Sequence, residues 1–247
     1  MHATITALDC GWLRTQRRTL LQGGSRDELR LPVPSWLVRH PHGTVVFDAG
    51  LHPGLAHGPE SLGDLAKIFA VELEVGGTVG HRLGEHDVDP LGTFTVVLSH
   101  LHWDHVGGLC ELPNARIVVQ RDEWAAASQG DGGGYDAALH DLGHDVLTVE
   151  GTHDLFGDGS VVCLPTPGHT CGHQSLRVVT AAGPVILAAD ACYFSATLDD
   201  GVLPPFGHDF TAQRTSLDLL RAERAGGTVI VPGHDADAFG RVAAAPL

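Results

Sequence analysis

The sequence predicts a layered α/β domain, and two observations carry this prediction. Short apolar runs rich in Val, Ile and Thr recur along the chain between Gly, Pro or Asp residues, which is typical of buried strands. Helical patterns fall between and after some of these runs, which favours helices packed against sheets. The 247 residues suffice for a sizeable core and no segment resembles a linker, so we expect one domain spanning residues 1–247.

The individual elements follow from these patterns. The strand candidates are residues 4–8, 36–38, 45–47, 93–98, 117–119, 161–164, 176–180, 185–189 and 229–231. The helix candidates are residues 60–70, 122–128 and 211–225. Asp122 is the expected N-cap of the second helix, because a carboxylate can accept hydrogen bonds from the first free N–H groups. Gly226 and Gly227 are expected to end the third helix.

The charge balance limits the partners of the protein. Thirty acidic and 15 basic residues give a formal net charge of −15, and such a surface repels nucleic acid and anionic membranes. The one tight basic cluster, Arg14, Arg17 and Arg18, is interpreted as a solvated N-terminal loop. No apolar run approaches the roughly 20 residues that span a bilayer. Because no signal peptide is recognisable, we expect a cytoplasmic location.

Polar side chains that bind metals follow several of the predicted strands. The segment S-H-L-H-W-D-H, residues 99–105, comes directly after the run at 93–98. Asp48 follows the run at 45–47, and Asp190 follows the run at 185–189. His169 and His234 each end a P-G-H sequence after a further run. Because sites in α/β proteins are built from loops at strand ends, these residues can converge.

Their chemistry suits two divalent cations. Imidazole nitrogens and carboxylate oxygens are ligands that zinc and similar ions accept. His100 and His102 are two residues apart, so in an extended segment both side chains reach the same ion. Asp104 and His105 project in a different direction, toward a second ion. His169, Asp190 and His234 can complete both shells, and the two oxygens of Asp190 allow it to bridge. The resulting modest positive charge would stabilise a developing oxyanion.

These motifs resemble the metallo-β-lactamase superfamily. S-H-L-H-W-D-H is similar to its H-x-H-x-D-H signature, and further matches follow in order at F-D-A-G (47–50), T-P-G-H-T-C-G-H (166–173), A-A-D (188–190) and V-P-G-H-D (231–235). The resemblance covers nearly the whole chain and implies an αββα sandwich with a dinuclear site at one edge. It implies one metal on His100, His102 and His169, a second on Asp104, His105 and His234, and Asp190 between them. Zinc is the expected metal, although the same ligands accept cobalt, manganese or iron.

Within that superfamily the chain is most similar to the N-acyl-homoserine lactone lactonases. The similar stretches are I-V-V-Q-R-D-E-W (117–124), P-G-H-T-C-G-H-Q-S-L (167–176) and D-A-C-Y (190–193). The resemblance implies a quorum-quenching hydrolase in which a metal-bridging hydroxide opens the lactone ring. In that scheme Tyr193 stabilises the oxyanion and Asp104 carries a proton to the leaving oxygen. Asp48 orients a loop or a ligating histidine, and His173 either does the same or is a structural histidine.

Several points stay open at the level of sequence. Cys171 stands where many relatives have proline, and Cys192 lies beside the expected site; neither is needed as a ligand. With an odd number of cysteines and no C-x-x-C, all five are expected to be free and mostly buried. Residues 50–90 show no match that predicts the acyl-chain preference, and the choice between monomer and homodimer is also open. The rivals are a metallohydrolase of other lactones, esters or phosphotriesters, and a non-catalytic metal-binding or ligand-binding protein.

Overall fold

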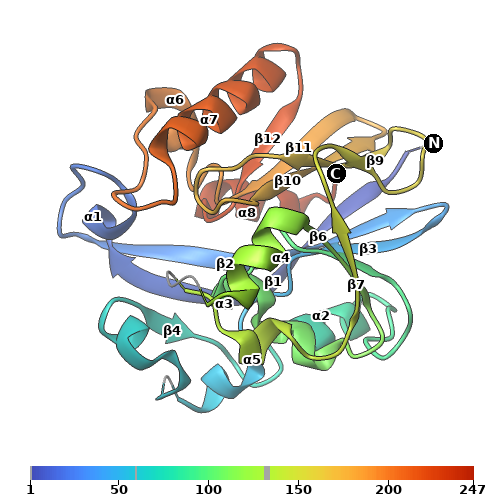
Figure 1. The fold of residues 1–247 in the computed structure, drawn as a ribbon, viewed down its shortest axis with the longest axis horizontal. Helices are drawn as coiled ribbons and strands as arrows, with labels where there is room; N and C mark the ends of the chain where they lie inside the picture. Colours follow the sequence, from blue (N-terminus) through green and yellow to red (C-terminus); the bar gives the residue numbers. More distant parts are fainter. Residues whose placement is uncertain (1, 59, 131–133) are drawn as a thin grey trace.

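The computed structural model describes residues 2–58, 60–130 and 134–247 (Figure 1). Two β-sheets form its centre. The larger sheet has the strand order β4-β1-β2-β3-β5-β6-β7, and the smaller has the order β12-β11-β10-β9-β8. The strands of the larger sheet are β1 (Thr4–Gln16), β2 (Glu28–His40), β3 (Gly43–Phe47), β4 (Ala70–Glu72), β5 (Thr95–Val97), β6 (Arg116–Gln120) and β7 (Asp145–Val149). Those of the smaller are β8 (His153–Asp154), β9 (Val161–Pro165), β10 (Gln174–Thr180), β11 (Gly183–Ala189) and β12 (Val229–Pro232).

The helices cover the outer faces of both sheets. The α-helices are α1 (Arg17–Leu20), α2 (Val79–Glu85), α3 (Trp103–Val106), α4 (Arg121–Ser128), α5 (Ala137–His140), α6 (Ser195–Asp200), α7 (Phe210–Ala225) and α8 (Ala236–Ala244). Helices α2 and α4 pack on the larger sheet, and α6 and α7 on the smaller one. Three short 3₁₀ segments are η1 (Pro53–His57), η2 (Glu60–Lys67) and η3 (Gly107–Glu111). Among the described residues no helix has the length and apolarity that crossing a membrane requires.

A buried core between the sheets holds the two halves together. Phe47 and Val97 of the larger sheet pack with Leu176 and Leu187 of the smaller one, and all four side chains are at most 1% exposed. Burial of such a side chain contributes about 1.5–3 kcal/mol. Helix, sheet, sheet and helix therefore lie in successive layers, and the αββα sandwich expected from the resemblance is confirmed.

The strand directions bring the predicted site residues to one edge. Strands β3, β5 and β6 are parallel neighbours, so Asp48, the 99–105 segment and the start of α4 follow their carboxyl ends. In the smaller sheet β9 and β11 both pair antiparallel with β10, and β12 is parallel to β11. The segments leading to His169, Asp190 and His234 therefore also leave one common edge.

The structure corrects several predicted elements. Strands β1 and β2 are much longer than the runs at 4–8 and 36–38, because their outer halves, in which charged residues and prolines interrupt the apolar ones, still pair, for example Leu13 with Leu31. The expected loop of Arg14, Arg17 and Arg18 is wrong. Arg14 lies in β1 with its Nε 2.7 Å from Oε1 of Glu72, and the other two arginines lie in α1.

Two of the helix predictions also need correction. Residues 60–70 do not form one helix, since Gly63 (φ 54°, ψ −125°) interrupts η2 and β4 begins at Ala70. Asp122 is not an N-cap; it lies in the first turn of α4, whose N-cap is Gln120. The third helix is confirmed as α7, and Asp209 caps it by accepting hydrogen bonds from the N–H groups of Thr211 and Ala212.

Candidate metal centre

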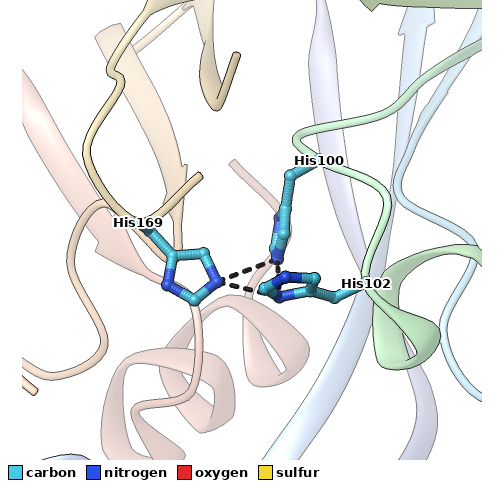
Figure 2. Close-up of side chains that lie close together, drawn as sticks. All are labelled: His100, His102 and His169. Carbon is cyan, nitrogen blue, oxygen red and sulfur yellow. Dashed lines mark hydrogen bonds between the residues drawn. The ribbon is translucent and has the colours of Figure 1, made fainter. Parts of the chain in front are cut away.

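Three histidines converge where β5 and β9 end. His100 is fully buried, and its Nε2 lies 3.0 Å from Nδ1 of His102. Nε2 of His169 lies 3.2 Å from Nε2 of His100 and 3.0 Å from Nδ1 of His102. Figure 2 shows the three rings directed at one point, His100 and His102 from one segment and His169 from another. The sequence predicted that His100 and His102 share a direction, and the structure brings both together with His169 as one candidate ligand group.

This spacing and protonation suit a cation better than mutual hydrogen bonding. Two nitrogens at about 2.0–2.1 Å from a tetrahedral zinc ion are separated by about 3.3 Å, close to the distances above. Burial holds the pKa of His100 and of His169 well below the usual range, with neighbouring histidines adding to the effect. Burial also lowers the pKa of His102 to about 4. All three rings are therefore neutral at pH 7, and each offers a lone pair.

A second candidate ligand group lies beside the first. It consists of Asp104, His105 and His234, whose ligand atoms lie within 4.8 Å of one another. His105 Nε2 is 3.8 Å and His234 Nε2 is 4.0 Å from Oδ2 of Asp104. Nδ1 of His234 donates to the carbonyl oxygen of Pro32 at 2.8 Å, so its Nε2 carries no proton in the neutral ring and faces the group.

The carboxylate of Asp190 lies between the two groups. Its Oδ2 is 3.2 Å from Nε2 of His169, and its Oδ1 is 3.1 Å from Nε2 of His234 and 3.4 Å from Nε2 of His105. Burial alone would raise the pKa of Asp190, but its pairing with His105 and His234 holds it well below its usual range, and the same pairing raises the pKa values of those two histidines. Oδ1 of Asp190 and Nε2 of His105 are buried, and among the described residues neither has a partner in hydrogen-bond geometry, although they face each other at 3.4 Å. Two such orphaned ligand atoms are what a site for a bound cation requires.

Asp48 forms hydrogen bonds with the 99–105 segment. Its Oδ1 accepts a hydrogen bond from the Ser99 N–H at 2.7 Å, and its Oδ2 accepts one from the Ser99 hydroxyl at 2.8 Å. Oδ2 also lies 2.8 Å from Nδ1 of His105, which places the proton of the neutral ring on Nδ1 and leaves Nε2 free. Asp48 itself has a φ of 61°, so its backbone turns sharply at the end of β3. These contacts are compatible with the predicted role of Asp48 in orienting His105, and that role stays a prediction.

His173 belongs to neither ligand group. Its Nδ1 lies 2.9 Å from the Thr166 hydroxyl, and its ring centroid lies 5.2 Å from that of His100. Burial lowers its pKa to about 3, so the ring is neutral. Support for His100 and a purely structural role both agree with this placement.

The candidate catalytic residues line one cavity with the ligands. The cavity has a volume of about 490 Å³ and contains Asp104, Asp190 and Tyr193 at its polar end. The Tyr193 hydroxyl lies 3.3 Å from Nδ1 of His169. Burial and the nearby Asp190 raise the pKa of Tyr193 well above its usual range, so its hydroxyl keeps its proton and can donate a hydrogen bond.

The rest of this cavity is apolar. Its walls include Leu20, Leu31, Leu65, Phe69 and Phe206. Two of them, Leu65 and Phe69, come from residues 50–90, whose sequence showed no match that predicts the acyl-chain preference. Trp103 is 8% exposed, packs in the neighbouring core cluster and also lines this cavity.

The cysteines take no part in the ligand groups. All five are free, as predicted; Cys10, Cys163 and Cys192 are buried. Cys171 is half-buried, and its thiol lies 3.4 Å from the carbonyl oxygen of Asp122. Burial raises the pKa of Cys192 to about 12, so this thiol is inert near neutral pH.

Two residues beside the centre were absent from the predicted site. Ser99 links Asp48 to the histidine segment, and Glu123 accepts backbone hydrogen bonds from two ligand-bearing segments. Glu123 lies within the matched stretch 117–124, and Ser99 opens the segment S-H-L-H-W-D-H. The sequence therefore contained a signal for both residues but no indication of what their side chains contact.

The sequence of this chain is similar to those of known proteins. A family profile described as "Metallo-beta-lactamase superfamily" matches residues 29–234. The N-acyl homoserine lactonase AttM of Azorhizobium caulinodans is 34% identical, over 90% of this chain and 89% of that protein. The N-acyl homoserine lactonase AiiA of Bacillus thuringiensis subsp. kurstaki is 30% identical, over 84% and 82%.

Solved structures agree with the fold. A crystal structure of a B. thuringiensis AiiA mutant with N-decanoyl-L-homoserine at its active site superposes with a TM-score of 0.88 at 24% identity, covering 98% of this chain and 97% of that one. AidC, described as a dizinc quorum-quenching lactonase, superposes with a TM-score of 0.71 at 14% identity, covering 95% and 88%. The profile match and the identity to AttM show the family: the chain belongs to the metallo-beta-lactamase superfamily.

Proposed function

We propose that this protein is a single-domain, metal-dependent hydrolase that opens the lactone ring of N-acyl-homoserine lactones, and so a quorum-quenching lactonase. The observation that carries the proposal is the placement of Asp190, with one oxygen toward each of two ligand groups beside an apolar cavity. Relatives over nearly the whole chain bear the name N-acyl homoserine lactonase. A lactone is an ester, so the activity belongs to the carboxylic-ester hydrolases.

The proposed ligand set divides between two divalent ions. His100, His102 and His169 would hold one, Asp104, His105 and His234 the other, and Asp190 would contact both. Zinc suits these nitrogen and oxygen ligands, which also accept cobalt, manganese or iron. When bound, such ions act as Lewis acids and lower the pKa of a water between them to near neutrality.

The side chains of the protein would position the substrate and move one proton. The apolar walls, such as Leu20 and Phe69, would hold the acyl chain and exclude water from the polar end. The protonated Tyr193 hydroxyl would donate a hydrogen bond to the lactone carbonyl oxygen as negative charge develops there. Asp104 is partly exposed and lines the cavity, so its carboxylate can accept the proton that the attacking water loses and pass it to the departing ring oxygen.

The rival functions differ from this proposal in substrate or in chemistry. Hydrolysis of other lactones, esters or phosphotriesters would use the same ligands. The largely apolar cavity favours a substrate with an acyl tail over a compact polar ester. A non-catalytic metal-binding protein has no need of a protonated tyrosine facing the cavity beside a full set of seven ligands. A cytoplasmic location and the absence of nucleic-acid partners remain predictions from the sequence.

Metal content combined with a substrate panel tests the function. The panel contains homoserine lactones of several acyl lengths, aliphatic lactones, a thioester and a phosphotriester. We expect two bound ions per chain and the highest kcat/KM with the acyl-homoserine lactones. Two bound ions without any opening of a homoserine lactone would reject the substrate assignment but would still support the proposed metal centre.

Replacing Tyr193 by Phe is expected to slow hydrolysis without releasing metal. Removal of one hydrogen-bond donor to a developing oxyanion costs about 10²-fold in kcat. We expect a fall of this size in kcat with two ions retained, measured by steady-state kinetics and metal analysis on the same sample. Loss of an ion from the Phe variant would contradict the role given to the hydroxyl.

A further inference from the structure

The side chain of Glu123 joins the two backbone segments that carry His100, His102 and His169. Glu123 is fully buried in the first turn of α4. Its Oε1 accepts a hydrogen bond from the N–H of Leu101 at 2.9 Å, and its Oε2 accepts one from the N–H of Gly172 at 3.1 Å. Leu101 lies between His100 and His102, and Gly172 lies three residues after His169.

The contact between these segments is close as well as polar. A Cβ atom on Gly172 would lie 2.2 Å from the backbone nitrogen of Glu123, so only glycine allows this approach. The backbone also links the two segments directly, because the N–H of Gln174 donates to the carbonyl oxygen of Ser99 at 2.9 Å. Glu123 therefore joins, through one side chain, the two segments whose three imidazoles meet in Figure 2.

We propose that Glu123 is a positioning residue that sets the spacing of the His100–His102–His169 ligand group and thereby the affinity of that group for its ion. A buried carboxylate with two backbone donors fixes both segments at once, and an N–H left without an acceptor in this place is unfavourable. Both bonded segments carry ligands of the first group, whereas of the second group Asp104 and His105 follow Leu101 by three and four residues and His234 lies outside both bonded segments. Loss of the carboxylate should weaken one ion selectively. This inference rests on the proposed metal centre and is independent of the substrate.

Glu123→Gln is the informative substitution. Glutamine keeps the shape of the side chain but offers one acceptor oxygen and one NH₂ group. The N–H of either Leu101 or Gly172 must then face another donor, so one segment is released. Glu111→Gln is the matched control, because Glu111 likewise accepts from one backbone N–H (Gly80, 2.9 Å) and one further donor (the Thr78 hydroxyl, 2.9 Å) but contacts no ligand-bearing segment.

Cobalt(II) titration of metal-free protein tests the proposal, with visible absorption reporting the coordination and native mass spectrometry counting ions. Two reference variants each lack one ligand: His169→Ala disables the first ligand group and His234→Ala the second. We expect two ions on the wild type and on Glu111→Gln. Glu123→Gln should bind one ion normally and the other about 10–100-fold more weakly, the usual effect of losing a partner that orients ligands. Its spectrum at one equivalent should match that of His169→Ala.

Either of two results would overturn this role for Glu123: both ions bound with wild-type affinity, or both weakened equally, as a general loss of stability would do. A wild type that binds no cobalt would instead reject the metal centre itself. If Glu123→Gln does not fold, amide hydrogen exchange of the metal-free wild type decides. We expect slow exchange at Leu101 and Gly172 alike, and fast exchange at either one contradicts the proposal.

Discussion

Asp190→Asn is expected to abolish tight binding of both ions and to lower kcat/KM by at least about 10³-fold. Loss of a residue that only orients a ligand costs about 10–100-fold, and Asp190 faces both ligand groups directly through its two oxygens. Asparagine keeps the volume but removes the negative charge that offsets the charge of two cations, and it leaves only one oxygen. Metal analysis after dialysis against low free metal, together with lactone hydrolysis, measures both effects.

The control for this variant is Asp154→Asn. The Asp154 carboxylate accepts backbone hydrogen bonds from Gly157 and Gly159 in a turn between β8 and β9, and it belongs to neither ligand group. We expect wild-type metal content and kcat/KM within about twofold, and far-UV circular dichroism should be unchanged in both variants. An Asp190→Asn protein that retains two ions with unchanged affinity would show that this carboxylate is no ligand.

Chelation of the wild-type protein is expected to remove all hydrolysis and to lower its thermal midpoint. Ligands that bind only the native state stabilise it by about 2.7 kcal/mol per site at a free concentration one hundred times Kd. For a chain of this length that corresponds to about 5–10 °C per site. Part of this loss of stability has a structural cause, because without cations Oδ1 of Asp190 and Nε2 of His105 are buried and lack a bound ion.

Restoration by different metals is the second half of that experiment. Zinc, cobalt, manganese and iron should each return activity and the thermal midpoint, because imidazole and carboxylate ligands accept them. Magnesium should not, since it prefers oxygen ligands in a strict octahedral arrangement. Full hydrolysis by chelated, metal-free protein, or restoration by magnesium alone, would contradict the assigned centre.

The segment S-H-L-H-W-D-H, the two P-G-H sequences and Asp190 were sufficient to predict the fold and a two-part ligand set. The αββα sandwich was implied by the resemblance of these motifs to a known superfamily. The residues themselves predicted a layered α/β domain whose ligands converge, because sites in α/β proteins are built from loops at strand ends. The long strands β1 and β2 were beyond the same reasoning. Their outer halves carry charged residues and proline, and hydrogen bonding between the two strands determines their length.

The sequence by itself determined which side chains can bind metal and to which superfamily the chain belongs. Only the tertiary structure decided how those side chains are divided and held. It placed one oxygen of Asp190 toward each ligand group, and it directed Nδ1 of His105 at the carboxylate of Asp48. It also brought Leu65 and Phe69 into the wall of an apolar cavity. It also put Glu123 between two ligand-bearing segments. These contacts join residues tens of positions apart, and distance in space is a property that no local pattern of residues encodes.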